Sequence, residues 1–193
     1  MRCQVRGLDP QNASARLIFR PTPIPGVVLI ELEQMVDERG FLARTFCAEE
    51  FSRNGLNPAL SQCSISFNHK ADTLRGMHYQ VAPFAEAKLV RCTRGAFYDV
   101  ALDLRKESAS YTAWFAQELS AENRRMLYIG EGIAHGFQTL TDDTEVLYQM
   151  SAPHRLEASR GVRWNDAAFG IEWPSADRRV MSERDRQYPD FRP

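Results

Sequence analysis

The chain has 193 residues and a formal net charge of -1, from 24 Lys and Arg against 25 Asp and Glu. This length fits one domain and buries enough surface for a core without disulfides or metals. Hydrophobic residues at 44% and charged residues at 25% are ordinary for a globular protein and argue against disorder. The balanced charge gives no reason to expect nucleic acid or an anionic membrane as the main partner.

The sequence predicts a cytoplasmic protein. No stretch approaches the ~20 apolar residues of a membrane helix, and residues 1–20 lack the apolar core of a secretion signal. We expect a polar extension over 1–20 and a single domain over 21–193. The four cysteines, at positions 3, 47, 63 and 92, show neither a disulfide framework nor zinc-finger spacing, so we interpret them as free thiols in a reducing compartment.

The first predicted elements are short strands and one helix. Residues 27–32 form a β-branched run that follows proline and glycine, which favours a strand. Residues 48–54 are the clearest helix of the main body, and Gly55 is its expected stop. Residues 88–92 and 96–104 are strands, and the short link between them predicts a hairpin.

Two further segments complete the pattern. Residues 145–150 form another strand whose apolar side chains share one face. The charged tail over 178–193 is expected to pack on the surface as turns or a short helix. Many short strands with Gly-rich turns and few helices favour a sandwich or barrel over a βαβ fold. The prediction is one all-β domain.

The four histidines differ in their surroundings. His78 lies in a strand-like stretch, and His135 lies between glycines that permit the close approach of another group. His69 and His154 lie in polar, loop-like sequence. Taken alone, each is more simply explained as a structural or solvated side chain, and Asp166 as an ordinary turn residue.

A metal site is an alternative that these histidines raise, since small β-barrels often hold Fe, Mn or Zn. Such a site needs two neighbouring histidines, a carboxylate and a further histidine. Around His78 there is no His-x-His, because position 80 is Gln, and the next carboxylate is Glu86. The set is short of ligands, so we expect no metal.

A series of motifs runs in a fixed order over about residues 22–185. The motifs are DERGF (37–41), LRGMHYQ (74–80), KLVR (88–91), DVALDLRKES (99–108), LSAEN (119–123), EGIAHGF (131–137), LY (147–148), WND (164–166) and GIEWP (170–174). In this order they resemble the dTDP-4-dehydrorhamnose 3,5-epimerase family, cupin-fold enzymes of deoxysugar biosynthesis. One motif alone is a weak signal, whereas the ordered set is highly specific.

The resemblance implies an all-β, cupin-type jelly-roll barrel with a few short helices. It also implies a homodimer that needs no metal and no redox cofactor. The catalytic residues it implies begin with His78 as the general base and Asp166 as the carboxylate that orients its imidazole. Lys88 then faces the C4 carbonyl oxygen of the sugar, and Tyr148 is the acid that delivers a proton at C5.

These residue types suit the inversion of a carbon in a 4-keto sugar. Hydrogens on C3 and C5 lie α to the carbonyl, so removing either gives an enolate. An imidazole with an ordinary pKa of ~6.5 is a good base at neutral pH, and a carboxylate fixes its tautomer. A cation stabilises the developing O4 anion, and a phenol can reprotonate the opposite face. The chain has no GxGxxG fingerprint for a redox dinucleotide.

The implied partner is a nucleotide-diphosphate sugar, whose phosphates require cationic side chains. Arginine suits this because it contacts phosphate oxygens with two parallel hydrogen bonds. The substrate-binding residues we expect are Arg39, Phe41, Gln62, Arg75, His135 and His154, and among them the resemblance implies Arg39, Gln62 and Arg75 on the nucleotide side.

Several positions depart from the family pattern. Arg44 stands where an acidic residue is usual, Ser64 replaces an asparagine, Gly130 replaces a proline, and Pro153 and His154 stand where tyrosines are found. These changes reverse a charge and remove an aromatic wall. A C3-only or C5-only epimerase, or one acting on another nucleotide's 4-keto sugar, is therefore the main alternative. A non-catalytic sugar-nucleotide-binding cupin and a metal-dependent cupin oxygenase are the alternatives from other classes.

Overall fold

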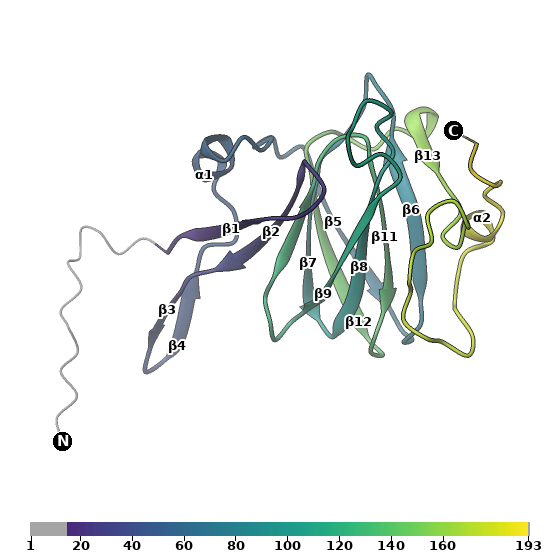
Figure 1. Cartoon of the computed structure of the whole chain (residues 1–193). Helices are drawn as coiled ribbons and strands as arrows, with labels where there is room; N and C mark the ends of the chain where they lie inside the picture. Colours follow the sequence, from purple (N-terminus) through teal and green to yellow (C-terminus); the bar gives the residue numbers. More distant parts are fainter. Residues whose placement is uncertain (1–14, 193) are drawn as a thin grey trace.

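Two antiparallel β-sheets face each other in a computed structural model that describes residues 15–192 (Figure 1). The six-stranded sheet has the order β1-β2-β10-β7-β12-β5, and the five-stranded sheet has the order β13-β6-β11-β8-β9. The first sheet comprises β1 (Leu17–Pro21), β2 (Val27–Leu32), β10 (Met126–Ile129), β7 (Lys88–Arg94), β12 (Thr144–Met150) and β5 (Gln62–Asn68). The second comprises β13 (Ser159–Gly161), β6 (Leu74–Gln80), β11 (Ile133–Thr139), β8 (Ala96–Asp103) and β9 (Trp114–Ser120). The predicted jelly-roll barrel is confirmed.

Little helix accompanies the two sheets in the described chain. The helical elements are α1 (Ala48–Arg53), a 3₁₀ helix (Leu156–Ala158) and α2 (Glu183–Arg186). A separate hairpin joins β3 (Gln34–Asp37) to β4 (Gly40–Ala43). The predicted helix over 48–54 is confirmed, and Gly55 follows it with φ +70°. No helix in the described part of the chain is long and apolar enough to cross a membrane.

The core lies between the two sheets because alternate side chains of each strand point inward. Val90 and Val146 from the six-stranded sheet meet Phe97 and Phe137 from the five-stranded sheet, and all four are almost completely buried. Strand β8 is also covered on its outer face, where Val100 and Leu102 pack in a second cluster.

Two predictions about the early and middle strands are wrong. Strands β7 and β8 do not form a hairpin, because β7 belongs to the six-stranded sheet and β8 to the five-stranded sheet. Gly95 makes the turn with φ +77°, and a Cβ there would lie 2.5 Å from the Thr144 Oγ1. The predicted extension is also too long, since residues 17–20 belong to β1, paired with β2. Residues 1–14 of that extension lie outside the described residues.

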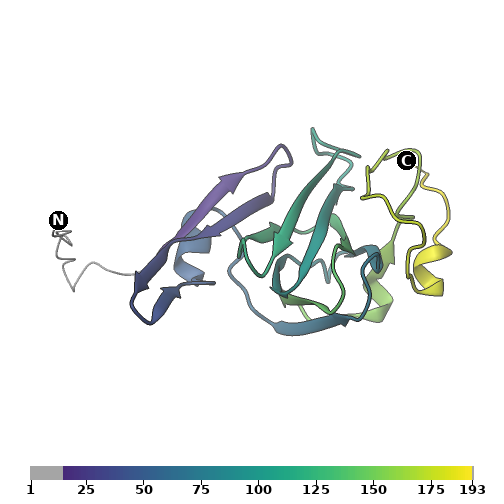
Figure 2. The same cartoon turned by 90° about the horizontal axis from the view of Figure 1, so that it is seen from below.

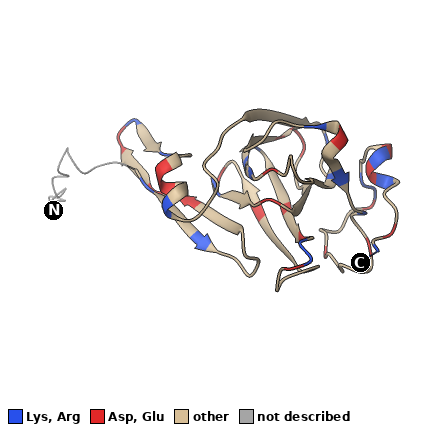
Figure 3. Cartoon of the chain, turned by 90° about the horizontal axis from the view of Figure 1, so that it is seen from above, with Lys and Arg blue, Asp and Glu red and all other residues tan. Residues whose placement is uncertain are grey.

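The remaining elements flank the barrel on opposite sides. In Figures 1 and 2 the β3–β4 hairpin and α1 lie at one side, and the C-terminal tail with α2 lies at the other. Figure 3 shows acidic and basic residues spread over the barrel, the hairpin and the tail rather than gathered on one face. This distribution agrees with the balanced net charge, so any cationic binding site must be local.

Candidate active site

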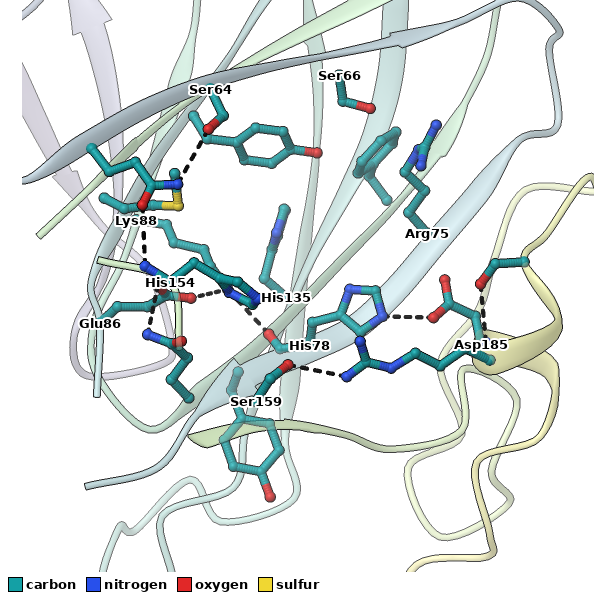
Figure 4. A pocket seen from close by; sticks show the side chains of 18 residues that line it. Ser64, Ser66, Arg75, His78, Glu86, Lys88, His135, His154, Ser159 and Asp185 are labelled. Carbon is teal, nitrogen blue, oxygen red and sulfur yellow. Dashed lines mark hydrogen bonds and ion pairs between the residues drawn. The ribbon is translucent and has the colours of Figure 1, made fainter. Parts of the chain in front are cut away.

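A cavity of about 450 Å³ opens between the sheets on the side that faces the tail. This volume lies in the range of small-molecule sites. Its walls come from β5, β6, β7, β11, β12 and the tail, as the close view in Figure 4 shows. The predicted residues that line it are Gln62, Arg75, His78, Lys88, His135, Tyr148 and His154. Seven residues far apart in the sequence are therefore gathered at one site.

His78 forms a hydrogen bond with a carboxylate of the tail. Its Nε2 lies 2.7 Å from the Asp185 Oδ1, and the other carboxylate oxygen accepts the backbone N–H of Gly76 at 3.3 Å. Burial opposes ionisation of Asp185, but the hydrogen bond and charge of His78, the Gly76 N–H and the Ser182 hydroxyl outweigh it and lower the pKa of this carboxyl. The ionised carboxylate accepts the Nε2–H, which leaves the lone pair of the imidazole on Nδ1.

Asp166 is not the partner of His78, so the predicted pairing is wrong. The Asp166 carboxylate is buried elsewhere, where it accepts the backbone N–H groups of Ala168 at 2.9 Å and Phe191 at 2.6 Å. It closes a turn and fastens the end of the tail. The interpretation of Asp166 as an ordinary turn residue matches this geometry.

Lys88 lies at the inner end of the cavity with one carboxylate beside it. Its Nζ lies 3.1 Å from the Glu86 Oε1 and donates to the backbone oxygen of His78 at 3.2 Å. Gln80 donates to the other oxygen of Glu86 at 3.0 Å. Both members of the pair are almost fully buried, so the ammonium is fixed in position beside the backbone of His78.

Tyr148 shares the cavity wall with a second His–Asp pair. The ring of His135 lies edge-on to the Tyr148 ring with the centroids 6.0 Å apart, and its Nε2 lies 2.6 Å from the Asp99 Oδ1. Burial, with the nearby charge of Asp99, raises the pKa of the Tyr148 phenol. The phenol therefore stays protonated at neutral pH and is available as a proton donor.

The remaining predicted pocket residues lie around the opening. Asn68 is buried and its Oδ1 accepts the Nε–H of Arg75 at 2.8 Å, which fixes the guanidinium at the cavity wall. Gln62 accepts the backbone N–H of His154 at 3.1 Å and donates to the hydroxyl of Ser64 at 3.4 Å. These contacts link β5 to the segment that carries His154.

Arg39 and Phe41 do not line this cavity in their own chain, contrary to the prediction. Both lie on the β3–β4 hairpin, which projects from the far side of the barrel (Figure 1). Arg39 pairs with Asp37 at 2.6 Å and its side chain is 84% exposed. The ring of Phe41 lies 4.7 Å from the guanidinium of Arg124. Arg44 also lies outside the cavity, where it pairs with Glu50 at 2.5 Å.

Several residues of the site were not predicted from the sequence. They are Asn68, Glu86, Asp99 and Asp185. Asp99 carried a usable signal, because a carboxylate in the middle of an apolar strand needs a buried partner. Asp185 carried only a local signal. The Ser182 hydroxyl accepts the backbone N–H of Asp185 at 3.1 Å, and a serine at this spacing indicates the start of a helix. It does not indicate a contact with His78.

Among residues 15–192 no group of three or more His, Cys, Asp or Glu side chains is arranged to hold a metal ion. Cys47, Cys63 and Cys92 are free thiols, and burial raises the pKa of Cys92 to about 11. The side chains that meet in the cavity are thus a base with its carboxylate, a buried ammonium and a phenol. This set can remove a proton, stabilise an oxyanion and return a proton.

Comparison with known proteins identifies relatives over nearly the whole chain. A family model described as dTDP-4-dehydrorhamnose 3,5-epimerase matches residues 21–193. The dTDP-4-dehydrorhamnose 3,5-epimerase of Sinorhizobium fredii is 42% identical over 175 residues, which cover 91% of this chain and 90% of that protein.

Solved structures give the same result. The Bacillus anthracis dTDP-4-dehydrorhamnose 3,5-epimerase, with TDP and PPi bound, has a TM-score of 0.85 and 34% identity, covering 92% of this chain and 100% of that one. ChmJ, a 3'-monoepimerase from Streptomyces bikiniensis in complex with dTDP-quinovose, has a TM-score of 0.82 and 30% identity, covering 88% and 86% of the two chains.

Proposed function

Since the chain belongs to the dTDP-4-dehydrorhamnose 3,5-epimerase family and is a carbohydrate epimerase, we propose that it inverts C3, C5 or both in a dTDP-linked 4-keto-6-deoxy hexose. The observation that carries the proposal is the 2.7 Å contact between His78 and Asp185 beside a cavity that Lys88 and Tyr148 also line. A binding module needs neither a base nor an acid, and this site contains both.

His78 removes the proton in the proposed mechanism. The C–H bond at C5 or C3 breaks, its electron pair enters the enolate, and the proton goes to the Nδ1 of His78. Asp185 holds the other nitrogen and stabilises the imidazolium that forms, a role for which its lowered pKa keeps it ionised. Positioned general bases of this kind contribute ~10²–10⁴-fold to the rate.

Lys88 and Tyr148 complete the inversion. The charge that develops on O4 is stabilised by the Lys88 ammonium, which Glu86 and the His78 carbonyl fix in place. At C5, Tyr148 gives its proton to the face opposite His78, and the phenolate and the imidazolium then exchange protons with water. Each inverted carbon therefore gains one solvent hydrogen, and the reaction requires no redox cofactor.

Arg75 binds the diphosphate of the substrate in this proposal. Its Nε is already engaged by Asn68, so its two terminal nitrogens are the donors that remain for phosphate oxygens. The rest of the wall is lined by Gln62, His135 and His154, which contact the sugar or the nucleobase of the substrate. Cationic side chains gathered at one cavity are compatible with a chain of nearly zero net charge.

We extend the proposal to a cytoplasmic homodimer in which the hairpin of one protomer completes the cavity of the other. Arg39 and Phe41 lie too far from their own cavity to bind its substrate, yet the hairpin projects freely. It also exposes Val36 at 75% and Leu42 at 66%, an apolar surface that favours a second copy. The three free thiols suit a reducing compartment.

Inversion at C3 alone is a second candidate, because the 3'-monoepimerase ChmJ is similar to this chain over 88% of its length. The two candidates differ in whether Tyr148 reaches C5. Incubation of the protein in D₂O with dTDP-, UDP- and GDP-linked 4-keto-6-deoxy hexoses, followed by NMR, tests both. Deuterium at C3 and C5 of the dTDP sugar supports double inversion, deuterium at C3 alone supports the second candidate, and no exchange with any sugar overturns the enzyme proposal.

A further inference from the structure

The position across the sheet from the catalytic histidine has no side chain of its own. Gly161 of β13 pairs directly with His78 of β6, and directly opposed residues point their side chains to the same face. A Cβ on Gly161 would overlap the ring of Tyr188, 2.5 Å from its Cε2 and its Oη. The ring of Tyr188 therefore occupies the place that a side chain at position 161 would fill.

Tyr188 contacts His78 without lining the cavity. The two rings meet edge to face, with centroids 6.1 Å apart and planes at 61°. The Tyr188 hydroxyl accepts the Nε–H of Arg184 at 3.0 Å, and Arg184 donates to the Ser159 hydroxyl at 3.0 Å. Tyr188 does not line the cavity itself, so it contacts the site through the ring of His78 and through Arg184, which does line it.

Asp185 lies on a short segment that is anchored at both ends. Upstream, Leu74 donates its backbone N–H to the Val180 oxygen at 2.9 Å, and Val180 donates to the Asp72 oxygen at 3.0 Å. Downstream, the next contact with the barrel is Tyr188 in the space above Gly161. Helix α2 between them has four residues, too few for a helix that is stable by itself. Its position therefore depends on contacts with the barrel, which are these two anchors and the Arg184 hydrogen bond to Ser159 between them.

We propose that Tyr188, seated over Gly161, is a positioning residue that holds the Asp185 carboxylate against His78. The proposal rests on the proposed function, in which this pair removes the substrate proton. Loss of the ring frees the downstream end of α2, and the carboxylate moves away from Nε2. A displacement of about 1 Å in a catalytic group is enough to cost ~10²-fold in rate.

The test compares Tyr188→Ala, Tyr188→Phe and Asp185→Asn with the wild type in the exchange assay. Tyr188→Ala should lower kcat ~10- to 100-fold and change KM by no more than about twofold, because Tyr188 does not touch the substrate. Tyr188→Phe keeps the ring and should retain most of the activity. Tyr188→Ala placed on Asp185→Asn should cost nothing further, because both act through the same carboxylate.

Gly161→Ala supplies the reciprocal variant. It should lower kcat as Tyr188→Ala does, and the double variant should be no slower than Tyr188→Ala, since the added methyl then has nothing to displace. Tyr98→Ala is the matched control, because the ring of Tyr98 packs on Trp173, away from the cavity, and kcat should be unchanged.

A crystal structure of Tyr188→Ala separates this proposal from the proposed function. Separation of His78 from Asp185 there supports the positioning role even if no 4-keto sugar is a substrate. A distance that stays at 2.7 Å, or a full additional loss of rate on the Asp185→Asn background, overturns the positioning role while leaving the epimerase proposal intact.

Discussion

The imidazole of His78 and the carboxylate of Asp185 lie 2.7 Å apart although 107 positions separate them in the chain. The contact joins β6 of the barrel to a tail that otherwise runs over its surface. The carboxylate that contacts His78 therefore comes from the tail, whereas the Asp166 carboxylate accepts backbone N–H groups of Ala168 and Phe191.

The substitutions Asp185→Asn and Asp166→Asn form a matched pair, and we expect opposite results from them. Asp185→Asn should lower the exchange rate by at least ~10²-fold, because the imidazolium loses its counter-charge. Asp166→Asn should leave kcat unchanged and lower stability by about 1–3 kcal/mol, because the Phe191 N–H loses a carboxylate acceptor. Exchange kinetics and thermal melts measure both, and the reverse pattern would restore the Asp166 assignment.

Tyr148→Phe should separate the two inversions. Removing the hydroxyl takes away the acid at C5, whereas proton removal by His78 remains. Deuterium should continue to enter at C3 while inversion at C5 falls by about 10²-fold or more, with C3 as the internal control. Equal loss at both carbons would argue that Tyr148 serves binding instead.

Lys88→Met should lower kcat by about 10²–10³-fold, the usual cost of removing one donor from an oxyanion. Lys70→Met is the control, since Lys70 is an exposed lysine paired with Asp142 on the surface. KM of the wild type and of both variants shows whether the loss falls on binding. A Lys88→Met enzyme with normal kcat would remove Lys88 from the mechanism.

The buried carboxylate of Asp103 should make the stability of the folded protein depend on pH. Burial opposes its charge, but hydrogen bonds from Arg105, Ser108 and Ser110 dominate and hold the pKa of this carboxyl far below its ordinary value. The stabilisation is complete above the unfolded pKa of about 4 and is lost as pH falls towards the folded value. Asp103→Asn should cost about 3 kcal/mol at pH 7 and progressively less below pH 4, as melting curves at each pH would show. A cost that is independent of pH would contradict this.

Mixed dimers test whether the hairpin completes the other protomer's cavity. His78→Ala and Arg39→Ala should each be inactive or weak alone. If the site is shared, each mixed dimer contains one cavity with both changes and one cavity with neither. Random pairing of equal amounts makes about half of the dimers mixed, so roughly a quarter of all cavities are intact. Mixing should therefore restore up to about a quarter of the wild-type activity per protomer. Light scattering gives the oligomeric state. A monomer, or dimers without complementation, would refute the shared site.

Strands whose apolar and polar side chains alternate could be predicted from the sequence. The pairing of strands that are distant in the sequence could not. β2 and β12 follow from their β-branched and alternating residues, and both are confirmed. β10 is buried along its whole length, so it carries no alternation to detect. The hairpin between β7 and β8 was wrong because a short Gly turn serves equally for a return within a sheet and a step between sheets.

The site was predicted in its components more fully than in its pairings. His78, Lys88, Tyr148 and Arg75 do line one cavity, as the motif order implied. Which carboxylate meets His78 depends on where the tail crosses the barrel, and no local pattern encodes that. The same holds for Arg39, because no local pattern encodes that its hairpin projects away from the cavity of its own chain.

The most direct measurement is the rate at which solvent deuterium enters C3 and C5 of dTDP-4-keto-6-deoxyglucose with the wild type and with His78→Ala, each confirmed folded by its melting curve. We expect deuterium at C3, C5 or both with the wild type and no enzymatic exchange at either carbon with His78→Ala. Exchange by a folded His78→Ala protein at the wild-type rate would show that His78 is not the base.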